Sequence, residues 1–161
     1  MKNLLSHGLV MATAVFVTLP ANSPSANPVI QRELKTDPRL VQLREFFANS
    51  GCPVEELAED FLIEADEHDL DWRLLPSIAI VESGGGKQSR NNNVFGWDSG
   101  NTSFQSVQAG IHHVASRLAI SDLYRDKDVD DILRTYNPRP GYIRRVKSVM
   151  ARLSPPDESL D

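Results

Sequence analysis

The sequence predicts a mainly α-helical domain that carries one short non-helical segment. Through most of the chain after residue 37, apolar residues recur at intervals of three and four positions, which is the spacing of one helix face. Pro38 and Gly51 stand where such a stretch begins and ends, as is typical of helix boundaries. Residues 94–97 instead alternate like a strand, 98–101 form a turn sequence, and 102–104 could return as a partner strand, so we expect a small β-hairpin or an ordered loop there.

The first 26 residues have the pattern of a secretory signal peptide followed by a linker. Met1 and Lys2 form a short positive start, residues 4–19 are largely apolar, and small residues with prolines follow over 20–28. A retained membrane anchor is the alternative, although the apolar run is shorter than the roughly 20 residues that cross a bilayer. Either interpretation predicts an exported domain, in the periplasm or outside the cell.

The remaining chain is the right size for one domain with one core, over residues 27–154, followed by a loose acidic tail over 155–161. Its single cysteine, Cys52, excludes an intrachain disulfide and is expected to be buried. A net charge of −5 argues against nucleic acid as a partner. We expect a monomer that uses no cofactor.

Six helices follow from the apolar spacing and its end signals. They are expected over about 38–49, 54–68, 71–83, 107–118, 129–136 and 142–153. Asp71 is the expected N-cap of the central helix, Ser106 that of the fourth, and an acidic run precedes the fifth. Pro76 marks a position at which the central helix could bend.

The central helix carries the most informative residue, Glu82. Leu75, Ile78 and Glu82 share one helix face, and a carboxyl among apolar groups loses the hydration that favours its charged form. Such a group can hold a proton near neutral pH and act as a general acid. The glycines at 84–86 should end the helix and leave room for a flat, bulky group to approach the backbone. The alternative is a solvated glutamate at a helix end.

The residues that follow could bind a sugar. Phe95 and Trp97 offer an apolar platform, and Asn92 and Asn93 offer the donors and acceptors that acetamido groups need. Ser83, beside Glu82, is a further candidate for substrate binding. Each has a structural alternative, because aromatic residues commonly pack in cores and asparagines commonly occupy turns.

No metal site is expected from the sequence. His112 and His113 are adjacent, so they point about 100° apart on a helix and cannot bind one metal together. The acidic run at 126–130 resembles the start of a calcium loop, but Asp131 and Asn137 stand where that loop needs glycine and glutamate.

Four segments, in this order and spacing, resemble the successive signatures of the bacterial glucosaminidase family. They are LPSIAIVESGG (75–85), NNVFG (92–96), FQSVQAGI (104–111) and TYNP (135–138), the last followed by Tyr142 and Val146. That family belongs to the lysozyme-like superfamily, together with the lytic transglycosylases and goose-type lysozymes. The resemblance covers about residues 71–153.

The resemblance implies a lysozyme-like fold with a glycan cleft between a helical lobe and a small hairpin lobe. It also implies cleavage of the β-1,4 linkage between N-acetylglucosamine and N-acetylmuramic acid in peptidoglycan strands. By position, Glu82 matches the family's acid/base, and Tyr136 matches a tyrosine that lies near it across the cleft. A core tyrosine on a helix face is the alternative for Tyr136.

A second catalytic carboxylate is less well defined. Asp98 and Asp122 are the candidates in the sequence for the partner that many glycosidases need. Lytic transglycosylases use one glutamate, because a hydroxyl of the substrate attacks and leaves an anhydro sugar. Hydrolysis, transglycosylation and a non-catalytic glycan-binding scaffold on the same fold therefore all remain open at this stage.

Overall fold

The computed structural model describes residues 37–154, and all regular structure in this part of the chain is helical. The expected signal peptide or anchor over 1–26 and the acidic tail over 155–161 lie outside the described residues. None of the helices within residues 37–154 is both long enough and apolar enough to span a membrane.

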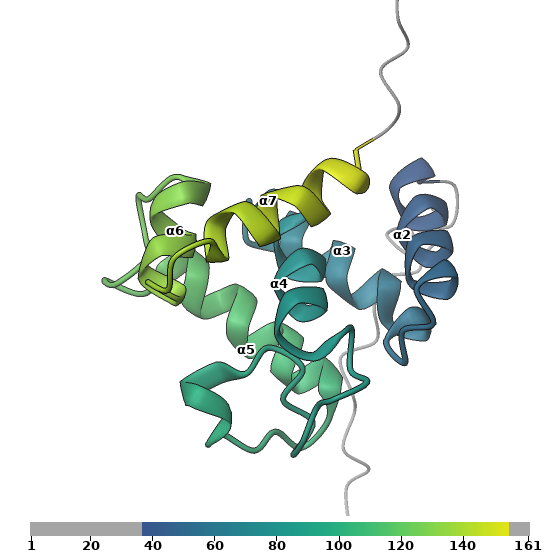
Figure 1. The fold of residues 1–161 in the computed structure, drawn as a ribbon, viewed down its shortest axis with the longest axis horizontal. Coiled ribbons are helices and arrows are strands. Elements are labelled where there is room, and N and C mark those ends of the chain that lie inside the picture. The colour runs from purple at the N-terminus through teal and green to yellow at the C-terminus, as the bar shows by residue number, and fades with distance from the viewer. Residues whose placement is uncertain (1–36, 155–161) are drawn as a thin grey trace, which may run out of the picture.

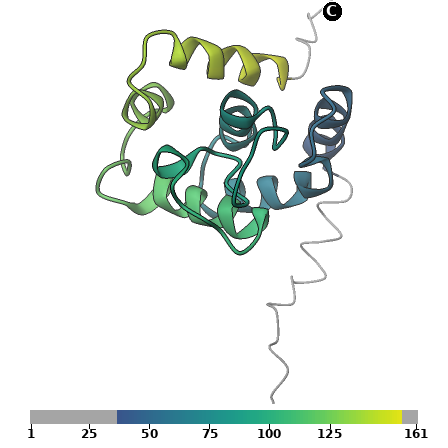
Figure 2. The same ribbon diagram turned by 60° about the horizontal axis from the view of Figure 1, so that its bottom comes forward.

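Six α-helices and two short 3-10 helices make up the fold (Figure 1). They are α2 (Pro38–Asn49), η1 (Glu55–Leu57), α3 (Ala58–Glu67), α4 (Leu74–Ser83), η2 (Trp97–Gly100), α5 (Val107–Ile120), α6 (Val129–Tyr136) and α7 (Tyr142–Arg152). In both views α4 lies near the centre, between α7 on one side and α5 on the other (Figures 1 and 2). α4 packs against α7 and α3, α3 packs against α2 and α5, and α6 packs against α7. The predicted mainly helical fold is confirmed.

Several helix starts are fixed by side-chain caps. The Ser106 hydroxyl accepts the backbone N–H of Ala109 at 3.1 Å, and Asp128 accepts that of Asp131 at 2.8 Å, so α5 and α6 begin where the sequence predicts. These bonds satisfy backbone donors that have no partner inside a helix. α2 begins at Pro38, as expected, after the cap residue Asp37.

The central helix begins two residues later than an N-cap at Asp71 predicts. Asp71 does accept a backbone N–H, that of Arg73 at 3.0 Å, but it also binds the Arg73 guanidinium at 2.9 and 2.6 Å. Regular α-helix then starts at Leu74. Pro76 therefore falls in the first turn, where a backbone N–H has no intrahelical acceptor to lose, and the expected reason for a bend is removed.

α4 is surrounded by the core over its first six residues. Leu74, Leu75, Ile78 and Ala79 are each 0% exposed, and Pro76 and Ser77 are also buried. Burying one leucine or isoleucine side chain contributes about 1.5–3 kcal/mol. The helix that carries Glu82 is thus held on every side except at its C-terminal end.

The glycines at 84–86 end α4 as predicted, but the space beside them is filled by the chain itself. Gly84 adopts a left-handed conformation (φ 64°) and its N–H donates to the Ile80 carbonyl at 2.9 Å. A Cβ on Gly85 would lie 2.6 Å from the Cys52 sulfur. The expectation that a ligand approaches this backbone is therefore wrong, because Cys52 occupies the position.

Of the two structures expected for residues 94–104, the β-hairpin is wrong, and the chain forms the ordered loop. Val94 and Phe95 are both 0% exposed, although a half-buried strand would bury only one of two neighbours. The Asn93 side chain supplies the bonds that a partner strand would have made: its amide nitrogen donates to the carbonyls of Trp97 and Thr102, both at 3.0 Å. The short helix η2 then occupies the expected turn.

Replacing Gly85 by alanine should lower the free energy of unfolding by about 2–5 kcal/mol. About 1–2 kcal/mol comes from the left-handed backbone (φ 65°), and about 1–3 kcal/mol comes from overpacking against the Cβ of Cys52, only 2.7 Å from the new methyl. Urea unfolding of both proteins measures the difference.

Gly100→Ala is the matched control for this prediction. Gly100 also has a positive φ (82°), but its added Cβ would meet nothing within 4 Å. Gly100→Ala should lower the free energy of unfolding only by the contribution of the left-handed backbone, about 1–2 kcal/mol. Equal losses in the two variants would contradict the packing argument.

Candidate functional site

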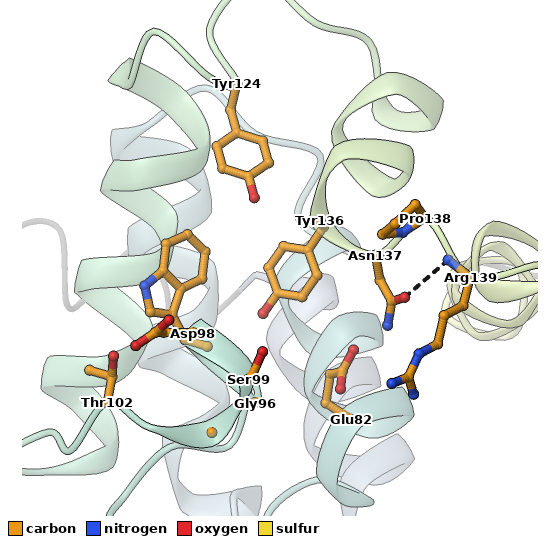
Figure 3. A pocket seen from close by; sticks show the side chains of 12 residues that line it. Glu82, Gly96, Asp98, Ser99, Thr102, Tyr124, Tyr136, Asn137, Pro138 and Arg139 are labelled. Carbon is orange, nitrogen blue, oxygen red and sulfur yellow. Dashed lines mark hydrogen bonds between the residues drawn. The ribbon is translucent and has the colours of Figure 1, made fainter.

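A cavity of ≈ 890 Å³ opens at the C-terminal end of α4 (Figure 3). Its walls come from the end of α4, the loop that contains η2, the segment before α6, and the end of α6 with the residues after it. The lining residues are Glu82, Gly96, Trp97, Asp98, Ser99, Gly100, Thr102, Tyr124, Tyr136, Asn137, Pro138 and Arg139. Four predicted site residues therefore meet here: Glu82, Trp97, Asp98 and Tyr136.

Glu82 is half-buried in the wall formed by α4, and its carboxylate faces the cavity (Figure 3). Gly96 makes room for it, because a Cβ at that position would lie 3.0 Å from Glu82 Oε2. Within residues 37–154 no lysine, arginine or histidine forms an ion pair with this carboxylate. The carboxylate is therefore accessible to a molecule in the cavity.

Tyr136 lies next to Glu82 and has a fixed hydroxyl. That hydroxyl donates to the Phe95 carbonyl at 2.7 Å, which ties the end of α6 to the loop. Burial, and then the negative charge of Glu82, raise the pKa of Tyr136 well above its ordinary value. The phenol thus stays protonated, with its donor already used on the chain.

Tyr142 is a neighbour of Glu82 that the sequence-based list of site residues omitted. Its ring stacks on that of Tyr136, with centroids 6.2 Å apart and planes within 6°. Its hydroxyl is buried and makes no hydrogen bond of ordinary geometry. Burial, and then the Glu82 charge, also raise the pKa of Tyr142 above its ordinary value. Two protonated phenols therefore lie behind the carboxylate.

Trp97 forms an aromatic wall of the cavity and also packs into the protein. Its ring lies 5.7 Å from the Tyr136 ring and 6.3 Å from the ring of Tyr124, centroid to centroid. Its other close neighbour is His113, at 5.7 Å. Both roles considered from the sequence, platform and packing, are thus compatible with its position.

Ser83 and Phe95 do not line the cavity. The Ser83 hydroxyl is buried, donates to the Val94 carbonyl at 2.7 Å and accepts the Gly86 N–H at 3.0 Å. Phe95 is 0% exposed and packs 6.1 Å from the Phe61 ring. Both residues hold the end of α4 and the loop together, and their contacts are with the chain.

The two asparagines also bind the chain. Asn93 is 4% exposed, and its side-chain oxygen accepts the Trp97 N–H at 2.9 Å. Asn92 is exposed but donates to the carbonyls of Phe104 and Gln105 at 3.0 and 3.2 Å. Asn93 thereby places Trp97 against the cavity, and neither amide lines it.

The two candidate second carboxylates have different positions. Asp98 lines the cavity from the loop and lies across it from Glu82 (Figure 3). Asp122 does not line the cavity; its side chain is 89% exposed and lies 3.2 Å from Arg125. Of the two, only Asp98 can reach a bound molecule.

The residues that follow α6 form a wall that sequence reasoning missed. Arg139 donates its backbone N–H to the Asn137 side chain at 3.2 Å, and both side chains face the cavity beside Glu82 (Figure 3). Arg139 brings a positive charge to this wall. The signal that could have found them is their position after Tyr136: Asn137 lies within the last segment of the family resemblance, and Arg139 directly follows that segment.

The three tyrosines of the chain should resist ionisation until the protein unfolds. Burial raises the pKa of Tyr124, Tyr136 and Tyr142 above the ordinary value of 10.0. The folded state therefore keeps protons that the unfolded state releases above pH 10, so this contribution to stability is complete below pH 10 and is lost as the pH rises further. Phenolate absorbance during an alkaline titration measures the effect.

Glu82→Gln should move this titration to lower pH, because the variant lacks the negative charge that helps to raise the pKa of Tyr136 and Tyr142. Asp122→Asn removes an equal charge from an exposed position outside the cavity and should leave the titration unchanged. Identical curves for wild type and Glu82→Gln would show that the carboxylate does not face the phenols.

Comparison of the chain with protein-family models, with curated proteins and with solved structures gives no match.

Proposed function

We propose that this protein is an exported glycosidase that cleaves peptidoglycan strands at the β-1,4 linkage between N-acetylglucosamine and N-acetylmuramic acid, with Glu82 as general acid and base. The observation that carries the proposal is a half-buried carboxylate without a cationic partner among the described residues, facing a cavity of ≈ 890 Å³ with aromatic walls. A cavity of this size accommodates a few sugar rings.

The chemistry needs one proton donor beside the scissile oxygen. Protonated Glu82 gives its proton to the glycosidic oxygen as the bond to the anomeric carbon breaks, and positive charge develops on the sugar ring. The leaving sugar departs as an alcohol. The Glu82 carboxylate then takes a proton from the nucleophile that attacks the anomeric carbon, which restores the starting state.

The walls fit a carbohydrate in chemical character. The rings of Trp97 and Tyr124 can cover the apolar face of a sugar, while Asn137 can exchange hydrogen bonds with an acetamido group. Arg139 brings guanidinium N–H groups to the same wall, and these can donate hydrogen bonds to carbonyl oxygens of the substrate. An apolar surface with a few convergent polar groups is the usual composition of a ligand site.

The family resemblance supports the same proposal. Glu82 comes from its first segment and Tyr136 from its last, 54 positions later by residue number, and the two side chains line one cavity. Under the proposal, the protein acts in the cell envelope and its partner is the peptidoglycan strand. The resemblance also suggests a lysozyme-like fold, with the ordered loop of residues 94–104 in the place of the hairpin lobe.

Lytic transglycosylation is the second candidate, and the role of Asp98 distinguishes it from hydrolysis. Asp98 is the only carboxylate besides Glu82 among the described residues that line the cavity, and it lies on the opposite wall. A reaction in which a hydroxyl of the substrate attacks needs no second carboxylate. In the hydrolytic reaction, Asp98 would have to orient the attacking water.

Glu82→Gln should lower the rate of peptidoglycan clearing by about 10²–10⁴-fold, because glutamine cannot donate the proton. The fall in turbidity of a peptidoglycan suspension measures the rate, and sedimentation with the suspension measures binding. Asp122→Asn is the matched control and should clear normally, since Asp122 lies outside the cavity.

Binding that is kept in Glu82→Gln while clearing is lost would support the assignment of Glu82 as the acid. Equal clearing by Glu82→Gln and the unsubstituted protein would remove that assignment. Binding without clearing by either protein would support the non-catalytic scaffold instead.

Mass spectrometry of the released fragments should find reducing-end sugars, because the open cavity admits water and Asp98 faces it. Asp98→Asn should then slow the release of these ends. Anhydro-muramic ends, with no effect of Asp98→Asn, would assign the reaction to transglycosylation. The same spectra identify which of the two alternating linkages is cut.

A further inference from the structure

Three side chains with metal-binding atoms meet between α3 and α5, away from the cavity. Glu64 belongs to α3, His68 directly follows that helix, and His112 comes from α5. Their ligand atoms all lie within 4.8 Å of one another. None of the three residues lines the cavity that contains Glu82, so the cluster needs an explanation of its own.

The distances suit a small cation. His112 Nδ1 lies 2.9 Å from Glu64 Oε1, and His68 Nε2 lies 3.5 Å from Glu64 Oε2. Ligands at about 2.0–2.1 Å from a tetrahedral Zn²⁺ are separated from one another by about 3.3 Å. The two spacings to Glu64 lie on either side of that value, and the two imidazole nitrogens lie within 4.8 Å of each other.

A simple ion pair does not account for all three residues. His112 contacts Glu64, but the Nε2 atom of His68 is buried and has no hydrogen-bond partner among the described residues. An unpartnered buried nitrogen costs about 1–3 kcal/mol. Its nearest carboxylate oxygen is the second oxygen of Glu64, and a metal ion bound between them would use this nitrogen as a ligand.

The local charge also favours a cation. Asp60 lies one turn before Glu64 on α3, and its pKa is raised first by burial and then by the charges of Glu59 and Glu64. Within residues 37–154, Glu64 pairs with His68 and His112 and with no lysine or arginine. The Glu64 carboxylate therefore has no permanently charged cationic partner among the described residues.

We propose that Glu64, His68 and His112 bind a divalent transition-metal ion of the Zn²⁺ type, which joins α3 to α5. Two imidazoles and one carboxylate suit Zn²⁺ and its neighbours, whereas Ca²⁺ and Mg²⁺ prefer sets made of oxygen. His112 is 64% exposed, so solvent can enter and water completes the coordination. The ion would brace the helix on which His113 packs against Trp97.

This site departs from the sequence-based expectation of no metal, and the reason is geometric. Spacing in the sequence pairs His112 with His113, but these two residues lie on different sides of α5. His113 contacts Trp97, and His112 contacts Glu64. The two partners of His112 lie 44 and 48 positions earlier by residue number, so only the packing of α3 on α5 brings them together.

Isothermal titration of the untagged protein with ZnCl₂ should show one bound ion, together with a rise in Tm. His112→Ala is the main variant because His112 is largely exposed and its loss should not unfold the chain. His112→Ala and Glu64→Gln should each weaken Zn²⁺ binding by about 10–100-fold or more, because each variant lacks one ligand of the ion. His113→Gln removes the adjacent histidine of the same helix and should bind Zn²⁺ normally.

Co²⁺ supplies a second readout, because the visible absorption of the bound ion reports its nitrogen and oxygen ligands directly. His68→Gln should lose or shift that spectrum. Circular dichroism checks that this variant is folded. Zn²⁺ binding that is unaffected by His112→Ala and Glu64→Gln would overturn the proposal. So would an absence of binding at millimolar Zn²⁺, or equal affinity for Mg²⁺. None of these outcomes bears on peptidoglycan cleavage, since no ligand of the ion lines the cavity.

Discussion

The burial of α4 is the constraint on which the rest of the structure depends. Its first two turns are enclosed by α7 and α3, with Leu74, Leu75, Ile78 and Ala79 fully excluded from solvent. A helix enclosed in this way can present a polar group only at its free end, and Glu82 lies there. The enclosure fixes the backbone that carries Glu82. The Glu82 carboxylate therefore has a defined position before anything binds.

Residue spacing predicted the helices well, because helix periodicity and caps are local. The start of α5 at Ser106 and both ends of α2 follow from neighbours in the sequence. The hairpin failed for the opposite reason. Alternation at residues 94–97 suggested a strand, but the carboxamide of Asn93 forms hydrogen bonds with Trp97 and Thr102. The local residue pattern does not predict these hydrogen bonds.

The difference between local and long-range contacts also explains which cavity residues could be predicted from the sequence. The helix pattern placed Glu82 at the end of its helix and the family resemblance placed Tyr136 near it, and both residues line the cavity. Tyr124 and Tyr142 could not be predicted as site residues, since each reaches the site through the packing of a different segment. Asn92, Asn93, Phe95 and Ser83 have the right chemistry for a ligand, yet their polar groups or rings contact the chain.

The cavity depends on the irregular backbone of residues 94–104, which replaces a hairpin. A β-strand through Gly96 would need an extended backbone, whereas its left-handed conformation (φ 60°) turns the chain directly beside Glu82. Asn93 then holds Trp97 by two hydrogen bonds, so that the indole lies against Tyr136 and not over the carboxylate. Because Gly96 has no side chain, the space beside Glu82 Oε2 stays open. Irregular backbone here thus separates the aromatic wall from the Glu82 carboxylate, and both line the same cavity.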